Sequence, residues 1–247
     1  MVNRLEERLL REYAQKSGEP LDALVRRAEN DEPVAYILGE WEFYSLPIKV
    51  TRDTLIPRPD TETLVDRAIE LLKGRAAPRI LDLCAGTGCV GLALAANIPG
   101  ATAILAELSE PALAVCRENI ALNGLTGRVA ARRADALKAP PENLGTFDVI
   151  VCNPPYIRTA VIAELDASVC AFEPITALDG GDDGLDFYRA VAAQWKTALK
   201  KGGKILFEVG YDQSAEVAEI LRRNEYVNIA ATRDLNNTER VIEGEIK

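Results

Sequence analysis

The sequence has no histidine among its 247 residues. This absence excludes histidine-ligated metal sites and every mechanism that uses a histidine as general base. The five cysteines are an odd number without C-x-x-C spacing, which is typical of reduced thiols and not of a disulfide framework. No stretch approaches the roughly 20 apolar residues of a membrane-spanning helix, and the charged N-terminus differs from a signal peptide. We therefore expect a cytoplasmic protein with no metal and no membrane partner.

Positive charge is also scarce. The chain has 29 Lys and Arg residues against 38 Asp and Glu residues, a formal net charge of −9. This balance disfavours non-specific binding to a polyanion, so we expect no direct contact with nucleic acid. With 48% hydrophobic and 27% charged residues, the composition is that of an ordinary globular protein, with a length for one large domain or one domain with a small appendage.

Segments with strand and helix patterns alternate from Arg79 onward, which indicates a parallel sheet covered on both faces. The expected strands are 79–83, 102–107, 128–133, 147–152 and 203–209, and the expected helices are 88–97, 110–123, 184–200 and 212–224. Strands 226–232 and 238–245 follow with no helix between them, so they should pair antiparallel. Seven strands in this order, Rossmann-like and mostly parallel with a C-terminal antiparallel hairpin, favour an α/β class I S-adenosylmethionine-dependent methyltransferase over a dinucleotide dehydrogenase.

The first third of the chain has a different pattern. Helices are expected at 3–16 and 20–29, and the aromatic, β-branched segment 35–50 around Gly39 indicates a hairpin. After two prolines a further helix begins, which Asp60 or Thr61 is placed to cap. We therefore divide the chain into a short helical part (1–32), a hairpin linker (33–55) and the main domain (56–247).

The segment "RILDLCAGTGCVGLALA" (79–95) reads as a strand, a turn with Gly86 and Gly88, and a helix. Such a turn lets a ligand approach the backbone beside a helix N-terminus, although a tight strand-to-helix turn without a ligand has the same pattern. Acids end three successive strands, namely Asp82, Glu107 and Asp135. Glu107 lies 21 residues after Gly86, the spacing of an acid that binds ribose hydroxyls. NAD would use the same acid, so these residues leave the cofactor open.

The segment "FDVIVCNPPYIR" (147–158) places Asn153 at the carboxyl end of the fourth strand, where such sheets bind ligands. Its amide oxygen and a neighbouring carbonyl would form two fixed acceptors for a planar –NH2 group. The following prolines hold these acceptors rigidly, and Tyr156 offers a flat surface for stacking. A carboxamide or an exocyclic nucleobase amine fits such a site, while a simple strand-ending turn remains the alternative.

N-P-P-Y after a hydrophobic strand resembles the amino-methyltransferases that act on DNA adenine or protein glutamine. Further segments narrow the resemblance: "PVAYILGEWEFYSLPIKV", "TLIPRPDTETLV", "FEPITALDGGDDGLDFYR" and "NTERVI" are together similar to the release-factor glutamine methyltransferases, the PrmC/HemK family. The resemblance runs from about Pro33 to the C-terminus. "IPRPDTE" in particular resembles this family and differs from its ribosomal-protein relative.

The resemblance implies a role for each motif. The turn would wrap the methionine part of S-adenosylmethionine, through Cys84, Ala85, Gly86, Thr87 and Gly88. Glu107 would hold the ribose, and Asp135 with Ala136 would border the adenine. The catalytic motif would hold the glutamine of a release factor's Gly-Gly-Gln tip beside the cofactor, through Asn153, Pro154, Pro155 and Tyr156. The departures from the family pattern are Cys84 and Ala85 in place of glycine and threonine, Glu107 in place of aspartate, and a short part before Pro33.

Three functions remain to be compared. The first is methylation of a release factor by a monomeric enzyme. The second is DNA adenine N6-methylation or methylation of a ribosomal-protein glutamine; the DNA enzyme predicts a basic groove that this acidic chain does not suggest. The third is a nucleotide-binding module without catalysis, which leaves Asn153 and its prolines without a purpose. The glycine- and acid-rich "FEPITALDGGDDGLDFYR" lacks the spacing and terminal glutamate of a calcium-binding EF-hand. We interpret it as an ordered loop that walls the cleft.

Overall fold

The computed structural model describes residues 2–247 and contains the predicted seven-stranded sheet. The parallel strands are β3 (Arg79–Leu83), β4 (Thr102–Glu107), β5 (Val129–Arg133), β6 (Phe147–Cys152) and β7 (Leu199–Glu208). The strand order is β5-β4-β3-β6-β7-β9-β8. β9 (Glu239–Glu245) lies between β7 and β8 (Val227–Arg233), antiparallel to both, so the predicted C-terminal hairpin is confirmed.

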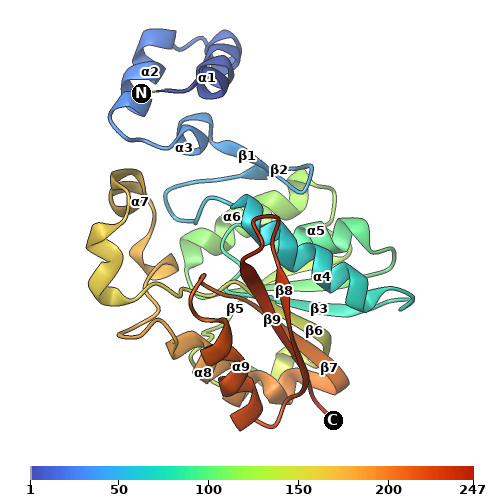
Figure 1. Cartoon of the computed structure of the whole chain (residues 1–247). Coiled ribbons are helices and arrows are strands. Elements are labelled where there is room, and N and C mark those ends of the chain that lie inside the picture. The colour runs from blue at the N-terminus through green and yellow to red at the C-terminus, as the bar shows by residue number, and fades with distance from the viewer. Residues whose placement is uncertain (1) are drawn as a thin grey trace.

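Helices cover both faces of this sheet (Figure 1). One face packs against α4 (Glu62–Leu72), α5 (Cys89–Asn97) and α6 (Glu110–Leu122), and the other packs against α8 (Asp186–Gln194) and α9 (Ser214–Arg223). Because both faces are covered, the central strands are mostly apolar, and all six residues of β6 are buried, Asp148 among them. A short helix, α7 (Ala167–Phe172), belongs to the long connection between β6 and α8.

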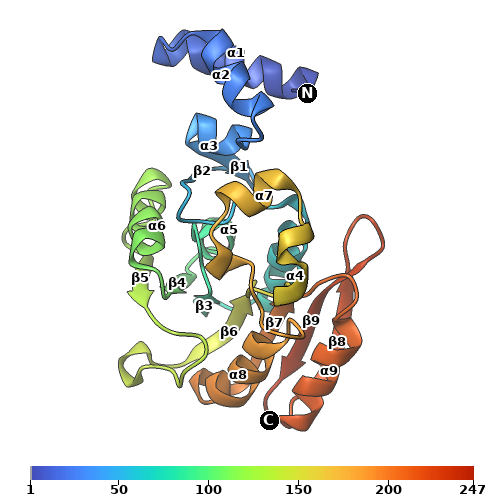
Figure 2. The same ribbon diagram turned by 90° about the vertical axis from the view of Figure 1, so that its left-hand side faces the viewer.

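The N-terminal helices form a small core of their own. α1 (Arg4–Ser17), α2 (Leu21–Glu29) and α3 (Val34–Leu38) bury Leu10, Leu24, Val34 and Ile37 together. In Figure 2, α1 and α2 lie at the end of the molecule opposite α8 and α9. Every helix within residues 2–247 is too short or too polar to cross a membrane.

A two-stranded hairpin, β1 (Glu40–Phe43) and β2 (Leu46–Lys49), connects the helices to the sheet domain. The hairpin is shorter than the predicted 35–50, because the first residues of that range belong to α3. This helix ends at Gly39, whose φ of 71° is typical of a helix C-terminus. The side chain of Asn119 on α6 bonds to both backbone groups of Lys49, at 2.7 Å and 3.0 Å. These two hydrogen bonds fix the hairpin against the sheet domain.

One predicted helix is shorter than expected. The helix predicted at 184–200 ends at Gln194, and β7 begins at Leu199, four residues before the predicted strand. A 3-10 turn joins them and buries Trp195, whose indole N–H donates to the carbonyl of Ala136 at 3.1 Å. Burial of this ring against the loop after β5 explains why the chain leaves the helix early.

Candidate functional site

A cavity of about 310 Å³ opens at the carboxyl ends of β3, β4, β5 and β6. Its volume is that of a small-molecule site, and its position is where open α/β sheets bind ligands. Ten of the residues singled out from the sequence line it: Asp82, Cys84, Ala85, Gly86, Thr87, Glu107, Asp135, Ala136, Asn153 and Pro155. Gly88, Pro154 and Tyr156 lie outside the lining in the part of the chain that the structure describes.

The glycine turn between β3 and α5 has three residues with left-handed backbone. Cys84, Gly86 and Gly88 have φ values of 60°, 55° and 82°. Glycine is required at position 88 for a second reason, because a Cβ atom there would lie 2.5 Å from the Leu105 side chain. Cys84 adopts the same region with a side chain, at some cost in strain. This conformation explains why glycine is the favoured residue where Cys84 stands.

Glu107 is held at the tip of β4 by three backbone N–H groups. Its Oε2 accepts from Gly86 at 2.9 Å, and its Oε1 accepts from Leu108 at 2.8 Å and Ser109 at 2.9 Å. The carboxylate is therefore fixed relative to the glycine turn before any ligand binds. A preorganised acceptor of this kind suits the two hydroxyls of a ribose.

Asp82 has two roles in the local structure. It lines the cavity from the end of β3, yet its side chain is almost fully buried, and its Oδ2 accepts from the N–H of Gly91 in the first turn of α5 at 2.8 Å. Burial, helped by the negative charge of Glu107 and opposed by the hydrogen bond from Gly91, raises the pKa of Asp82 to about 8. Asp82 is therefore mostly protonated near neutral pH in the free protein.

The charge of the lining is one-sided. Besides the mostly protonated Asp82, it contains three further acids (Asp53, Glu107 and Asp135) and one cationic side chain, Arg58. Arg58 is already paired with the buried carboxylate of Glu173, a residue of the "FEP" segment. A diphosphate would meet repulsion here, whereas a ligand with positive charge would be attracted. The electrostatics therefore disfavour a dinucleotide and favour a cationic cofactor.

Asn153 follows β6 and faces the cavity. Its Nδ2 donates to Oγ1 of Thr61 at 3.3 Å, and Thr61 is itself buried.

The expected capping of α4 is wrong, because that helix has no side-chain cap bond at Thr61. Asp60 instead pairs with Arg240 of the "NTERVI" segment at 3.1 Å. Thr61 and Asp60 thus serve contacts with distant segments in preference to the helix end.

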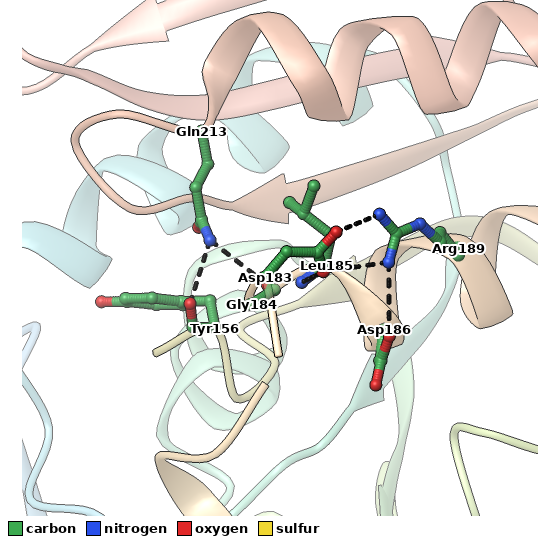
Figure 3. Close-up of polar contacts among 7 residues, drawn as sticks. All are labelled: Tyr156, Asp183, Gly184, Leu185, Asp186, Arg189 and Gln213. Atoms are coloured by element: carbon green, nitrogen blue, oxygen red, sulfur yellow. Dashed lines mark hydrogen bonds and ion pairs between the residues drawn. The ribbon is translucent and has the colours of Figure 1, made fainter. Parts of the chain in front are cut away.

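The backbone after Asn153 is locked by Gln213 (Figure 3). The Nε2 of Gln213 donates to the carbonyl oxygens of Tyr156 at 2.9 Å and Gly184 at 3.2 Å, and its Oε1 accepts from Gly210 at 3.0 Å. Gln213 is buried, so all three bonds are shielded from water. The motif is therefore held by the loop before α8 and the turn before α9.

The acid-rich loop before α8 uses its carboxylates in ion pairs. Asp183 and Asp186 both bind Arg189, which lies one turn into the helix (Figure 3). Within residues 2–247 no group of three or more potential metal-binding side chains occurs. The loop lies against the backbone of the Asn153 motif, where Gly180 and Gly184 have no room for a side chain beside Pro155 and Tyr156.

Sequence reasoning missed several residues that shape the site, namely Arg58, Thr61, Glu173, Glu208, Gln213 and Arg240. Four of them, Arg58, Thr61, Glu173 and Arg240, lie in segments quoted for the family resemblance, and Thr61 was expected only to cap a helix. Glu208 and Gln213 belong to "FEVGYDQ". A carboxylate at the end of an apolar strand, as at Glu208, is the sequence signal that indicates a residue near the site. Glu208 is 2% exposed.

Comparison with known proteins agrees with this geometry. The family model "Methyltransferase small domain" matches residues 61–168. The chain is 37% identical over 219 residues to a release factor glutamine methyltransferase of Clostridium botulinum, covering 89% of this chain and 77% of that protein. It is 39% identical to that of Agrobacterium fabrum, covering 89% and 76%. Among solved structures, the hMettl16 catalytic domain in complex with a 3′UTR hairpin has the same fold, with a TM-score of 0.67, 17% identity and coverage of 83% and 77%.

Proposed function

Because the chain belongs to the release factor glutamine methyltransferases, we propose that it transfers a methyl group from S-adenosylmethionine to a peptide chain release factor. The acceptor is the side-chain amide nitrogen of the glutamine in the Gly-Gly-Gln motif. The observation that carries this proposal is the position of Asn153. Its side chain faces the cavity, and its –NH2 group is bound to Thr61, so its Oδ1 is left to accept from a ligand.

The residues of the cavity fit S-adenosylmethionine, which supplies an electrophilic methyl group on a positively charged sulfur. The turn from Cys84 to Gly88 would hold the amino-acid part beside Asp82, and Glu107 would accept from the ribose hydroxyls. Asp135 and Ala136 would border the adenine. The excess of carboxylates in the lining supports a cationic ligand, since an opposite charge within a few ångströms is attracted most strongly in a partly buried site.

The reaction requires the amide nitrogen of the glutamine side chain, a weak nucleophile, to attack the methyl group. The nitrogen lone pair of a carboxamide is delocalised into its carbonyl, so the nitrogen reacts poorly in water. Asn153 Oδ1 and the backbone carbonyl of Pro154 accept from the two N–H bonds of the glutamine, which orients the nitrogen and stabilises the positive charge that develops on it. Pro154 and Pro155 keep these acceptors rigid, and Tyr156 anchors the end of the motif through its carbonyl bond to Gln213.

The transfer breaks the bond between the methyl carbon and the sulfur, whose electron pair stays on the sulfur of the product S-adenosylhomocysteine. No side chain has to remove a proton before the transfer, because the methylated amide nitrogen carries a positive charge, is strongly acidic and loses a proton to water. The complete absence of histidine is therefore compatible with the reaction. What the protein supplies is orientation and a fixed electrostatic environment.

The experiment is mass spectrometry of a release factor after incubation with the chain and S-adenosylmethionine, with duplex DNA present at equal concentration. We expect one added methyl group, on the Gly-Gly-Gln glutamine, and none in a release factor with alanine at that position. Methylation of the DNA at a higher rate would support an adenine methyltransferase instead. Methylation of a ribosomal protein in preference to the release factor would support the related protein enzyme.

A further inference from the structure

Two side chains of α6 hold the backbone of the glycine turn (Cys84–Gly88) from behind. Cys116 Sγ donates to the carbonyl oxygen of Gly86 at 3.1 Å, and Asn119 Nδ2 donates to the carbonyl oxygen of Thr87 at 3.0 Å. Both side chains are fully buried. Gly86 and Thr87 line the cavity, whereas Cys116 and Asn119 lie outside its lining. The two side chains therefore act on the cavity only through the backbone of the turn.

The partners of Asn119 fix the orientation of its amide. Its Oδ1 accepts from the N–H of Lys49 at 2.7 Å, and its Nδ2 donates to the carbonyl oxygens of Lys49 and Thr87, at 3.0 Å each. A backbone N–H only donates and a carbonyl only accepts, so the reversed amide would lose all three bonds. This one side chain therefore joins the glycine turn to the β1–β2 hairpin.

The bonds from α6 determine which way the peptide groups of the turn face. Every peptide bond within residues 2–247 is trans, so the C=O and N–H of one peptide group point in opposite directions. The carbonyl of Gly86 faces α6, so the N–H of Thr87, in the same peptide group, faces away from α6 and toward the cavity. This N–H meets no acceptor among residues 2–247, whereas the N–H of Gly88 donates to Ala85 at 2.7 Å. One backbone donor of the turn is therefore free for a ligand.

A free donor at this place suits the amino-acid part of S-adenosylmethionine, which carries a carboxylate. Arg58, the one cationic side chain of the lining, is already paired with Glu173. The remaining charged side chains of the lining are acids, which repel a carboxylate. A backbone N–H attracts a carboxylate oxygen through a charge-assisted hydrogen bond and needs no cationic side chain.

We propose that Cys116 and Asn119 are positioning residues for the cofactor, which turn the carbonyls of Gly86 and Thr87 away from the cavity and so present the Thr87 N–H to the carboxylate of S-adenosylmethionine. This inference rests on the proposed function, because it names what prepares the cofactor site of that reaction. Neither residue touches the cofactor. Loss of either bond should weaken cofactor binding and leave the methyl-transfer step nearly unchanged at saturation.

The first test compares two asparagines of α6 and its C-terminal end by titration calorimetry with S-adenosylmethionine. Asn123 is the matched control, because its Nδ2 also donates to the hairpin, to the carbonyl of Pro47 at 3.0 Å, but makes no bond to the glycine turn. We expect Asn119→Ala to bind about 3- to 10-fold more weakly, since it loses a bond that organises the site. Asn123→Ala should bind within about twofold of the wild type. Equal affinities in the two variants, at a temperature where thermal melts show both to be folded, would overturn the proposal.

The cysteine provides the second test, which also decides the matter if Asn119→Ala does not fold. Cys116→Ala removes the donor to Gly86, while Cys116→Ser keeps a donor on the side chain. Cys170→Ala is the control, because that thiol also donates to a backbone carbonyl, of Ile162 at 3.0 Å, but within the connection between β6 and α8. We expect Cys116→Ala to bind about 3- to 5-fold more weakly and the other two variants to bind as tightly as the wild type. Cys116→Ala with the affinity of Cys170→Ala would overturn the role of this bond.

Steady-state and single-turnover kinetics distinguish positioning of the cofactor from a general disturbance of the site. In Asn119→Ala the KM for S-adenosylmethionine should rise with the Kd, while the single-turnover rate at saturating cofactor stays within about threefold of the wild type. A lowered rate with an unchanged KM would contradict a role in cofactor binding.

Hydrogen exchange of the ligand-free protein tests the hold on the turn without any cofactor. The N–H of Gly88, which closes the turn onto Ala85, should exchange faster in Asn119→Ala than in Asn123→Ala. Equal exchange of this amide in the two variants would contradict the positioning role.

The failure of this inference differs from the failure of the proposed function. A wild type that binds S-adenosylmethionine but methylates no release factor would overturn the proposed function and leave this inference standing. A wild type that methylates a release factor, with Asn119→Ala and Cys116→Ala variants of normal cofactor affinity, would overturn this inference alone. A wild type that does not bind S-adenosylmethionine would overturn both.

Discussion

Gly184 lies directly against the carbonyl oxygen of Tyr156: a Cβ atom at Gly184 would approach that oxygen to 2.3 Å. Real Cβ atoms do not come so close to an oxygen, so a side chain at Gly184 has to displace the end of the Asn153 motif. The loop before α8 and the catalytic motif are therefore packed backbone to backbone, and Gln213 bonds to both.

Gly184→Ala should disturb the site and Gly124→Ala should not. Both glycines have left-handed φ values, 76° and 66°, but Gly124 faces open space at the end of α6. Backbone strain is common to both variants, so the difference isolates the contact with Tyr156. We expect Gly184→Ala to lose about 1–3 kcal/mol more unfolding free energy and to transfer methyl groups more slowly. Similar melts and rates for the two variants would show that the contact is unimportant.

Glu107→Ala should weaken S-adenosylmethionine binding about 10- to 100-fold, because a hydrogen-bonded charge at the ribose contributes about 1.5–3 kcal/mol. The substitution also removes the acceptor that holds the Gly86 N–H. Glu110→Ala, an exposed glutamate of the following helix, is the control and should bind within about twofold of the wild type. Titration calorimetry measures both, and an unchanged affinity in Glu107→Ala would remove this residue from the cofactor site.

Binding of a cation beside Asp82 should release a proton. The pKa of Asp82 is raised to about 8 by burial, so at about pH 7 the free protein holds the acid form. A positive charge nearby favours the carboxylate and lowers that pKa. Calorimetry in two buffers of different ionisation enthalpy should therefore detect release of close to one proton per S-adenosylmethionine, and Asp82→Asn should abolish it. Proton uptake on binding would contradict the placement of the cationic group.

Glu208 should make stability fall as pH rises. Burial, helped by the negative charge of Asp60 and opposed by the Thr61 and Tyr156 hydroxyls and by Arg240, raises its pKa to about 7. The folded state thus binds a proton that the unfolded chain has already lost, and this stabilisation disappears as pH rises from the unfolded pKa through about 7. Between about pH 5.5 and pH 8, Glu208→Gln should gain about 2 kcal/mol relative to the wild type. Urea unfolding at both pH values checks this, and a constant difference would contradict it.

The sheet was predictable from the sequence because its strands are short apolar runs between turn signals. The boundaries of β3, β4 and β6 agree with the prediction, since two covered faces favour mostly apolar strands that stand out between the turn signals. The start of β7 was not predictable, because the helix before it ends where Trp195 finds a partner in a distant loop. A contact between segments far apart in the chain has no local sequence signal.

The residues of the site also fall into two groups, those with a local sequence signal and those placed by contacts between distant segments. Glu107 ends β4, Asn153 directly follows β6, and Gly86 lies in the turn after β3, so strand ends and spacing were enough to bring them together. Thr61 and Gln213 reach the same place from other segments, and their contacts depend on tertiary packing. The capping prediction for Thr61 failed for this reason: local propensity favoured the helix end, while the hydroxyl oxygen accepts from Asn153, 92 residues away in the chain.

The most direct test of the central claim is the single-turnover rate of Asn153→Ala with a release factor at saturating S-adenosylmethionine, beside a thermal melt and a binding titration. Loss of one preorganised polar contact should lower the rate about 10²- to 10³-fold, with cofactor affinity within a few-fold and the melt little changed. Asn153→Asp should also be impaired, because it loses the –NH2 group that binds Thr61. A fast Asn153→Ala enzyme with a lowered melting temperature would contradict the account and leave Asn153 as a residue that only ends a strand.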